Sequence, residues 1–174
     1  LNWEAENVPA ILDVWFGGSE TADAVADVLF GDVNPSGKLT MSFPKNVGQV
    51  PLYYAAKNTG RPLLEGRWFE KFRSNYLDVD NDPLYPFGYG LSYTTFTKEI
   101  VSKSTGNGKV RVDVKVTNTG DVSGKDAVQI YYSAPYTGKI EKSAIVLGGY
   151  EKTKLLAPNE SEIVTVEFDI NDMA

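Results

Sequence analysis

The 174-residue sequence predicts two regions of different fold class: an α/β segment over residues 1–95 and an all-β sandwich over residues 96–174. Two observations support this division. In the first region, an apolar run, an amphipathic helix pattern and an alternating stretch follow one another in α/β order. In the second region, several short segments alternate apolar and polar residues, with turn sequences between them, which is typical of a β-sandwich.

The α/β segment opens with a mostly apolar run over residues 9–16, followed at once by Gly17-Gly18. Such a run suits a buried strand of a parallel sheet, which need not alternate. Further on, Leu39, Met41 and Phe43 alternate with polar residues before Pro44. This alternation predicts a second strand that the proline ends.

An amphipathic helix is predicted between these strands, over residues 19–30. Apolar side chains recur there at steps of three or four residues. Ser19 or Thr21 can cap the helix, and Gly31 can end it.

Residues 45–92 combine prolines, glycines, aromatics and charges without a sustained period. We interpret them as a long irregular segment within the α/β region. A loop of this length in a compact domain is usually functional.

The β region predicts an immunoglobulin-like sandwich. Alternating valines over residues 110–116 place charged residues on the opposite face, and residues 128–132 and 164–170 alternate in the same way. A further apolar stretch, residues 144–147, ends at Gly148-Gly149. The inner face is predicted to hold six apolar side chains: Val112, Val114, Ile130, Val164, Val166 and Phe168.

Composition excludes several functions. The net charge is −6 and no lysine or arginine run occurs, so we expect no nucleic-acid partner. No apolar run approaches the roughly 20 residues that span a bilayer, so we expect no membrane partner. The absence of cysteine and histidine removes thiolate metal sites and every Ser-His or Cys-His catalytic pair.

Three stretches resemble glycoside hydrolase family 3. Residues 10–38 are similar to the family pattern in which a strand ending in Trp-Phe precedes a helix and Asn-Pro-Ser-Gly-Lys. Residues 83–96 resemble the hinge into the family's last domain. Residues 116–121, 127–131 and 147–152 resemble that domain, a fibronectin III-like sandwich. One small departure is Gly17, where the family usually has proline.

The resemblance implies part of a retaining β-glycosidase of the β-glucosidase type, which hydrolyses terminal non-reducing β-linked sugars. It also implies a nucleophilic aspartate on an earlier barrel domain and an acid/base glutamate upstream in the α/β domain. We therefore expect no catalytic residue, metal ligand or cofactor in this chain, which alone should be inactive. Its partners would be a β-linked oligosaccharide or glycoside, bound through the parent enzyme, and the missing amino-terminal barrel. The sandwich is expected to be incomplete at its end.

Four residues are candidates for substrate binding: Trp15, Arg67, Trp68 and Arg73. The tryptophans can stack on sugar rings and the arginines can hydrogen-bond hydroxyl groups. The alternatives are core packing for Trp15 and a solvated loop for the other three. Glu20 follows a predicted strand end, but we interpret it as a charge at the helix amino terminus.

Two other functions remain open: the sandwich is a carbohydrate-binding module, or it is purely structural. Asp78, Asp80 and Asp82 imitate a calcium loop, but Pro83 stands where that loop requires glycine, so no metal site is expected. The sequence leaves open the sugar, glucose or xylose, and the compartment, where periplasmic or extracellular is favoured over cytoplasmic.

Overall fold

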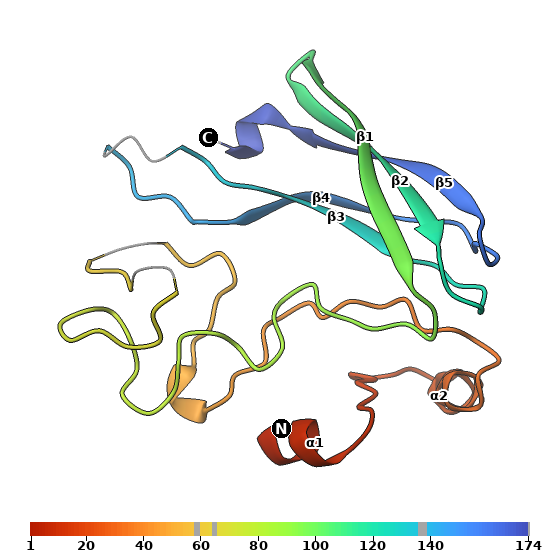
Figure 1. Cartoon of the computed structure of the whole chain (residues 1–174), viewed down its shortest axis with the longest axis horizontal. Coiled ribbons are helices and arrows are strands. Elements are labelled where there is room, and N and C mark those ends of the chain that lie inside the picture. Colours follow the sequence, from red (N-terminus) through yellow and green to blue (C-terminus); the bar gives the residue numbers. More distant parts are fainter. Residues whose placement is uncertain (58–59, 64–65, 136–138, 174) are drawn as a thin grey trace.

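The computed structural model describes all residues other than 58–59, 64–65, 136–138 and 174. Two β-sheets face each other, and the amino-terminal half of the chain lies along one side of them (Figure 1). This arrangement confirms the predicted β-sandwich. No helix of the described residues is long and apolar enough to cross a membrane.

One sheet has three strands in the order β1-β2-β5, and the other pairs β3 with β4; all pairings are antiparallel. The helical elements are α1, α2 and the 3-10 helices η1 and η2. In chain order the elements are α1 (Asn2–Asn7), α2 (Thr21–Phe30), η1 (Val47–Gln49), β1 (Phe96–Gly106), β2 (Lys109–Asn118), β3 (Ala127–Tyr132), β4 (Val146–Lys152), β5 (Ser161–Asp169) and η2 (Ile170–Met173).

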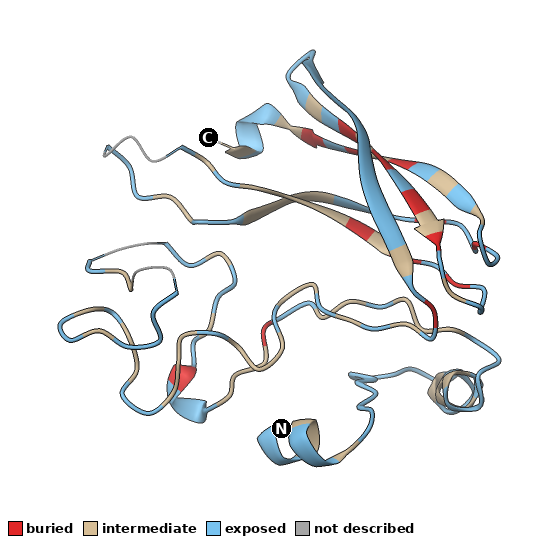
Figure 2. Cartoon of the chain, viewed as in Figure 1, coloured by how far each residue is buried: buried red, intermediate tan, exposed pale blue. Residues whose placement is uncertain are grey.

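The core lies between the two sheets, and the neighbouring strands β2 and β5 of the three-stranded sheet supply most of its apolar side chains. Register pairs Val112 with Val166 and Val114 with Val164, so the central positions on one face of both strands are apolar. Buried residues therefore gather in the sandwich (Figure 2). Five of the six predicted inner residues are buried and the sixth, Ile130, packs against them, which confirms the predicted face.

Two details of the sandwich differ from expectation. β1 has no apolar alternation and is exposed over most of its length, so the sequence pattern did not reveal it. β4 continues through Gly148 and Gly149 instead of ending there. A Cβ atom at Gly148 would lie 2.8 Å from the Phe168 ring, so glycine allows this strand to approach β5.

In the amino-terminal half the helix and the irregular character of the described part of residues 45–92 were predicted correctly. α2 ends at Gly31, whose φ of 86° is the left-handed conformation expected of a glycine stop. Its N-cap is Glu20, not Ser19 or Thr21, and no side chain caps it. The predicted strands over residues 9–16 and 39–43 are wrong: Phe43 makes only an isolated bridge with Tyr85, and residues 9–16 are exposed. A parallel strand needs a neighbouring strand, and the described residues provide none beside residues 9–16.

A buried carboxylate joins the amino-terminal half to the sandwich. Asp126 immediately precedes β3, and only 6% of its side chain is exposed. Its two oxygens contact Lys98 of β1 at 2.6 Å and Lys38 at 3.3 Å. Lys38 also donates to the carbonyl of Gly90 at 2.6 Å. One carboxylate thus connects three segments that are distant in sequence.

Asn34 makes a second connection beside the first. Its side-chain oxygen accepts from Ser92 Oγ and Tyr93 N, and its amide donates to the carbonyl of Ser123. Gly124 is required here, because a Cβ atom would lie 2.6 Å from the Asn34 amide nitrogen. The amino-terminal half therefore packs closely against the backbone of the sandwich.

We predict that Phe168→Ala lowers the free energy of unfolding by about 3–5 kcal/mol, because the ring is buried and stacks on Tyr132 with centroids 5.9 Å apart. Urea denaturation of this chain measures the change. Ile163→Ala on the same strand is the control, since Ile163 is 61% exposed and should cost under about 0.5 kcal/mol. Equal losses from the two variants would contradict the core described above.

Candidate functional site

The long segment over residues 45–92 is held at its base by Gln49, which is completely buried. The Gln49 side-chain oxygen accepts from the backbone N–H groups of Lys45 and Asn46, and its amide donates to the carbonyls of Asp80 and Asp82. Every hydrogen-bonding group of this side chain is engaged. The start of the segment is thereby fixed to residues 80–82.

Residues 66–73 form an aromatic and cationic stretch of this segment, which we call the aromatic turn. Trp68 is 63% exposed and its ring lies 5.6 Å from Phe69. Phe72 is also exposed, and Lys71 Nζ lies 4.9 Å from its ring centroid. The turn offers apolar ring faces and cations to solvent.

The predicted arginines occupy this same turn. Arg67 is exposed, whereas Arg73 is partly buried and contacts Glu70 at 3.4 Å. The structure therefore brings Arg67, Trp68 and Arg73 into one stretch of chain. Arg67 is the more accessible of the two guanidinium groups.

Trp15 belongs to a different cluster. Its ring lies 6.0 Å from Phe43, and its backbone N–H donates to the Asp13 carboxylate at 3.0 Å. Its φ of 46° lies in the left-handed region, which is rare for a bulky residue and marks a constrained position. The ring is half-exposed, so Trp15 is not a core residue of this chain.

Glu20 and Asp80, two of the acidic residues considered from the sequence, both have structural roles. Glu20 stands at the amino end of α2, as interpreted from the sequence. Asp80 accepts from Lys45 at 2.7 Å, and this hydrogen bond holds the pKa of the Asp80 carboxyl below its usual range. The described residues include no group of three or more acidic, histidine or cysteine side chains that can hold a metal ion.

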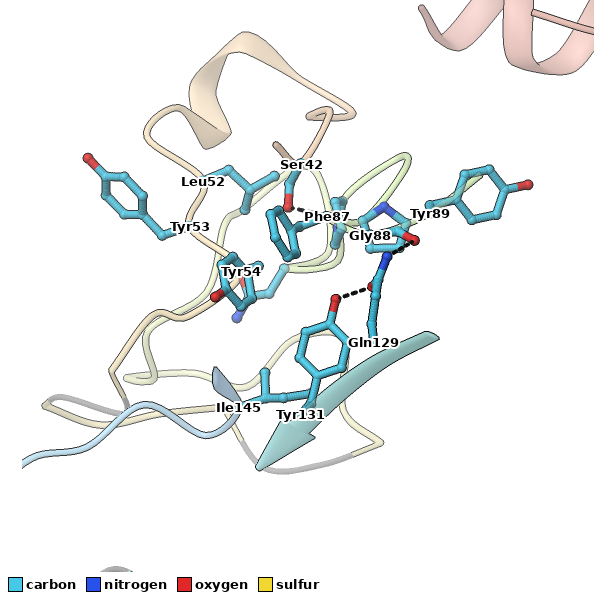
Figure 3. Close-up of a pocket in the computed structure, with 13 residues that line it drawn as sticks. Ser42, Leu52, Tyr53, Tyr54, Phe87, Gly88, Tyr89, Gln129, Tyr131 and Ile145 are labelled. Carbon is cyan, nitrogen blue, oxygen red and sulfur yellow. Dashed lines mark hydrogen bonds between the residues drawn. The ribbon is translucent and has the colours of Figure 1, made fainter. Parts of the chain in front are cut away.

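A pocket of about 530 Å³ opens where the long segment meets the sandwich, and we call it the junction pocket (Figure 3). Leu52, Tyr54 and Phe87 project into it from the long segment, and Tyr131 and Ile145 line it from the sandwich side. Tyr54 and Phe87 stack with centroids 4.1 Å apart, and Tyr54 meets the Tyr131 ring edge-on at 6.3 Å. Aromatic and aliphatic carbon forms most of the wall.

The polar groups of the junction pocket are held in place by hydrogen bonds. Tyr131 donates its hydroxyl to Gln129 Oε1 at 2.6 Å, and Gln129 donates to the carbonyl of Gly88. Tyr54 accepts from the backbone N–H of Leu147, and Ser42 accepts from that of Phe87. Burial raises the pKa of the Tyr131 phenol above its usual value.

Sequence reasoning missed this pocket. Tyr131 lies in the predicted alternating stretch over residues 128–132, but Tyr54 and Phe87 lie 77 and 44 residues before it, and only the folded chain brings the three rings together. One signal was available: Gly88, whose Cβ would lie 2.3 Å from Gln129 Oε1 and 2.5 Å from the Tyr131 hydroxyl. A glycine among aromatics marks a close approach of two segments.

Comparison with known proteins identifies the class. The family model described as Glycosyl hydrolase family 3 C-terminal domain matches residues 1–93. The periplasmic beta-glucosidase of Salmonella typhimurium is 47% identical over 171 residues, which is 96% of this chain. A beta-xylosidase of Formosa agariphila is 42% identical over 177 residues, or 99% of the chain. The chain spans only 22% and 23% of the length of these two relatives.

Solved structures of β-glucosidases also superpose on this chain. The beta-glucosidase of Listeria innocua superposes with a TM-score of 0.86 and 39% identity over 97% of this chain and 23% of its own. Beta-glucosidase 3B of Thermotoga neapolitana, in complex with α-D-glucose, superposes with a TM-score of 0.72 and 37% identity over 93% and 23%. Fold and relatives together define a portion of a glycoside hydrolase. The chain belongs to glycosyl hydrolase family 3 and corresponds to a carboxy-terminal portion of its β-glucosidases.

Proposed function

We propose that this chain is part of a retaining β-glycosidase that hydrolyses terminal non-reducing β-linked sugars. The observation that carries the proposal is the superposition of nearly the whole chain on the Listeria innocua beta-glucosidase at 39% identity. The relatives are named beta-glucosidase and beta-xylosidase, so glucosides and xylosides are the substrates to compare.

The chain's role in this activity is to support the catalytic domains. A retaining glycosidase needs a nucleophile and an acid/base carboxyl about 5–5.5 Å apart. The family resemblance assigns both to segments upstream of residue 1, and the chain spans under a quarter of its relatives' length. The barrel that carries the nucleophile is thus the partner we propose for residues 1–95.

We further propose that the chain divides near Thr95, between an α/β segment and the fibronectin III-like sandwich. The family model ends at residue 93 and β1 begins at Phe96. The buried Asp126 connection would then hold the two domains in one orientation.

The aromatic turn and Trp15 are the proposed substrate contacts of this chain. Trp68 offers an exposed ring face, and the exposed Arg67 offers guanidinium donors to sugar hydroxyls. The φ of 46° at Trp15 is unusual for a bulky residue, and this strain supports a constrained functional position. Arg73 would orient the turn through Glu70.

We propose a periplasmic or extracellular location for the enzyme. The support is the name of the Salmonella typhimurium relative, which is a periplasmic beta-glucosidase.

The 174-residue chain alone is expected to hydrolyse neither aryl β-glucoside nor aryl β-xyloside, because the family resemblance places both catalytic carboxylates outside it. The full-length protein that contains it should cleave at least one of them. Assays of both proteins under the same conditions test the proposal. Turnover by the chain alone that disappears in Glu20→Gln would contradict the assignment of catalysis to upstream residues.

Trp68→Ala in the full-length enzyme is expected to lower kcat/KM for a β-linked disaccharide about two- to tenfold, as expected for the loss of one stacking contact. The kcat/KM for a small aryl glycoside should change little, because such a substrate does not extend to the turn. Tyr150→Ala is the control, since Tyr150 is an equally exposed aromatic residue on β4. Equal effects of Trp68→Ala on both substrates would make the aromatic turn structural.

A further inference from the structure

The junction pocket has the dimensions and construction of a small-molecule site. Its volume of about 530 Å³ falls within the range of roughly 300–1,000 Å³ found for ligand pockets. Its walls come from both ends of the long segment and from the sandwich, so it exists only when the two halves of the chain are joined. Apolar walls with a few fixed polar atoms are the usual composition of such sites.

Charge limits the ligand to a neutral molecule. The described residues that line the pocket include no aspartate, glutamate, lysine or arginine. A phosphate, carboxylate or amine would enter without a counter-charge, which is unfavourable in a partly dehydrated site.

The ring faces and hydroxyl groups limit the ligand further. Tyr54, Phe87 and Tyr131 converge on the pocket from two sides (Figure 3). The hydroxyls of Tyr54 and Ser42 each accept a backbone N–H, so each still has a proton to donate. The Tyr131 hydroxyl donates to Gln129 and can still accept. A purely apolar ligand would leave the remaining donor or acceptor capacity of these hydroxyls unused, whereas a molecule with apolar faces and several hydroxyls would engage it.

We propose that the junction pocket binds a pyranose sugar, with its C–H faces against the aromatic rings and its hydroxyls bonded to Ser42, Tyr54 and Tyr131. The choice of glucose as the first sugar to test rests on the proposed function. Binding at this pocket does not depend on turnover, so it is measured separately from hydrolysis.

The test is equilibrium dialysis of labelled glucose against the full-length protein, comparing wild type with Ile145→Trp. Ile145 lines the pocket, and an indole at this position would obstruct it. Wild type should bind one more glucose per chain than Ile145→Trp. Ile163→Trp, which adds the same side chain at an exposed position of β5, should bind as wild type does. Equal binding by wild type and Ile145→Trp would overturn the proposal.

Tyr131→Phe keeps the ring and removes one hydroxyl. It is the second test variant, to be used if Ile145→Trp lowers the melting temperature of the protein. It should weaken this glucose site about two- to tenfold, as expected for one lost hydrogen bond. Unchanged glucose affinity would overturn the assigned contacts. Phenol is the probe for an apolar ligand: if it occupies the pocket while glucose does not, the sugar assignment is wrong. Absence of hydrolysis with a normal glucose count would contradict only the proposed function.

Discussion

The arrangement of this chain depends on the buried carboxylate of Asp126. A charge removed from water is costly unless opposite charges and hydrogen bonds surround it. Here Lys98 is supplied by the sandwich and Lys38 by the amino-terminal half, and the N–H of Ala127 donates to the same carboxylate. The full set of three partners forms only when both halves are in place. The Lys38 contact joins the amino-terminal half to the start of β3, the strand that carries Gln129 and Tyr131 of the junction pocket.

The sandwich was predictable because its signals are local. Val112 and Val114 lie two residues apart on one strand, and a period of two determines which face they share. The junction was not predictable, since Lys38 and Asp126 are 88 residues apart and neither has a local pattern that marks its partner. The run over residues 9–16 shows that a local pattern alone is not sufficient. Its composition suits a strand, but strand formation requires a neighbouring strand, which the described residues do not provide.

The residues of the candidate site also divide into those that the sequence predicted and those that only the fold brings together. The sequence identified Trp68 and Arg67 because aromatic and cationic residues are adjacent in one irregular stretch, and the structure exposes both. It did not group Tyr54 with Tyr131, because their contact depends on the joining of the two halves. The two proposals place sugar contacts at two separate positions of this chain. The aromatic turn is proposed to contact substrate of the parent enzyme, and the junction pocket is proposed to hold a sugar between the halves of this chain.

The central claim is that Asp126 and Lys38 stabilise the chain as a pair, and a double-mutant cycle tests it most directly. Urea denaturation gives the free energy of unfolding of the 174-residue chain with Lys38→Met, with Asp126→Asn and with both changes. Lys38→Met alone should cost up to about 3–5 kcal/mol, because it leaves a buried carboxylate with one partner fewer. The double variant should lose less than the sum of the single losses, by at least about 1 kcal/mol. Losses that simply add would show that the two residues act independently, which would contradict their pairing.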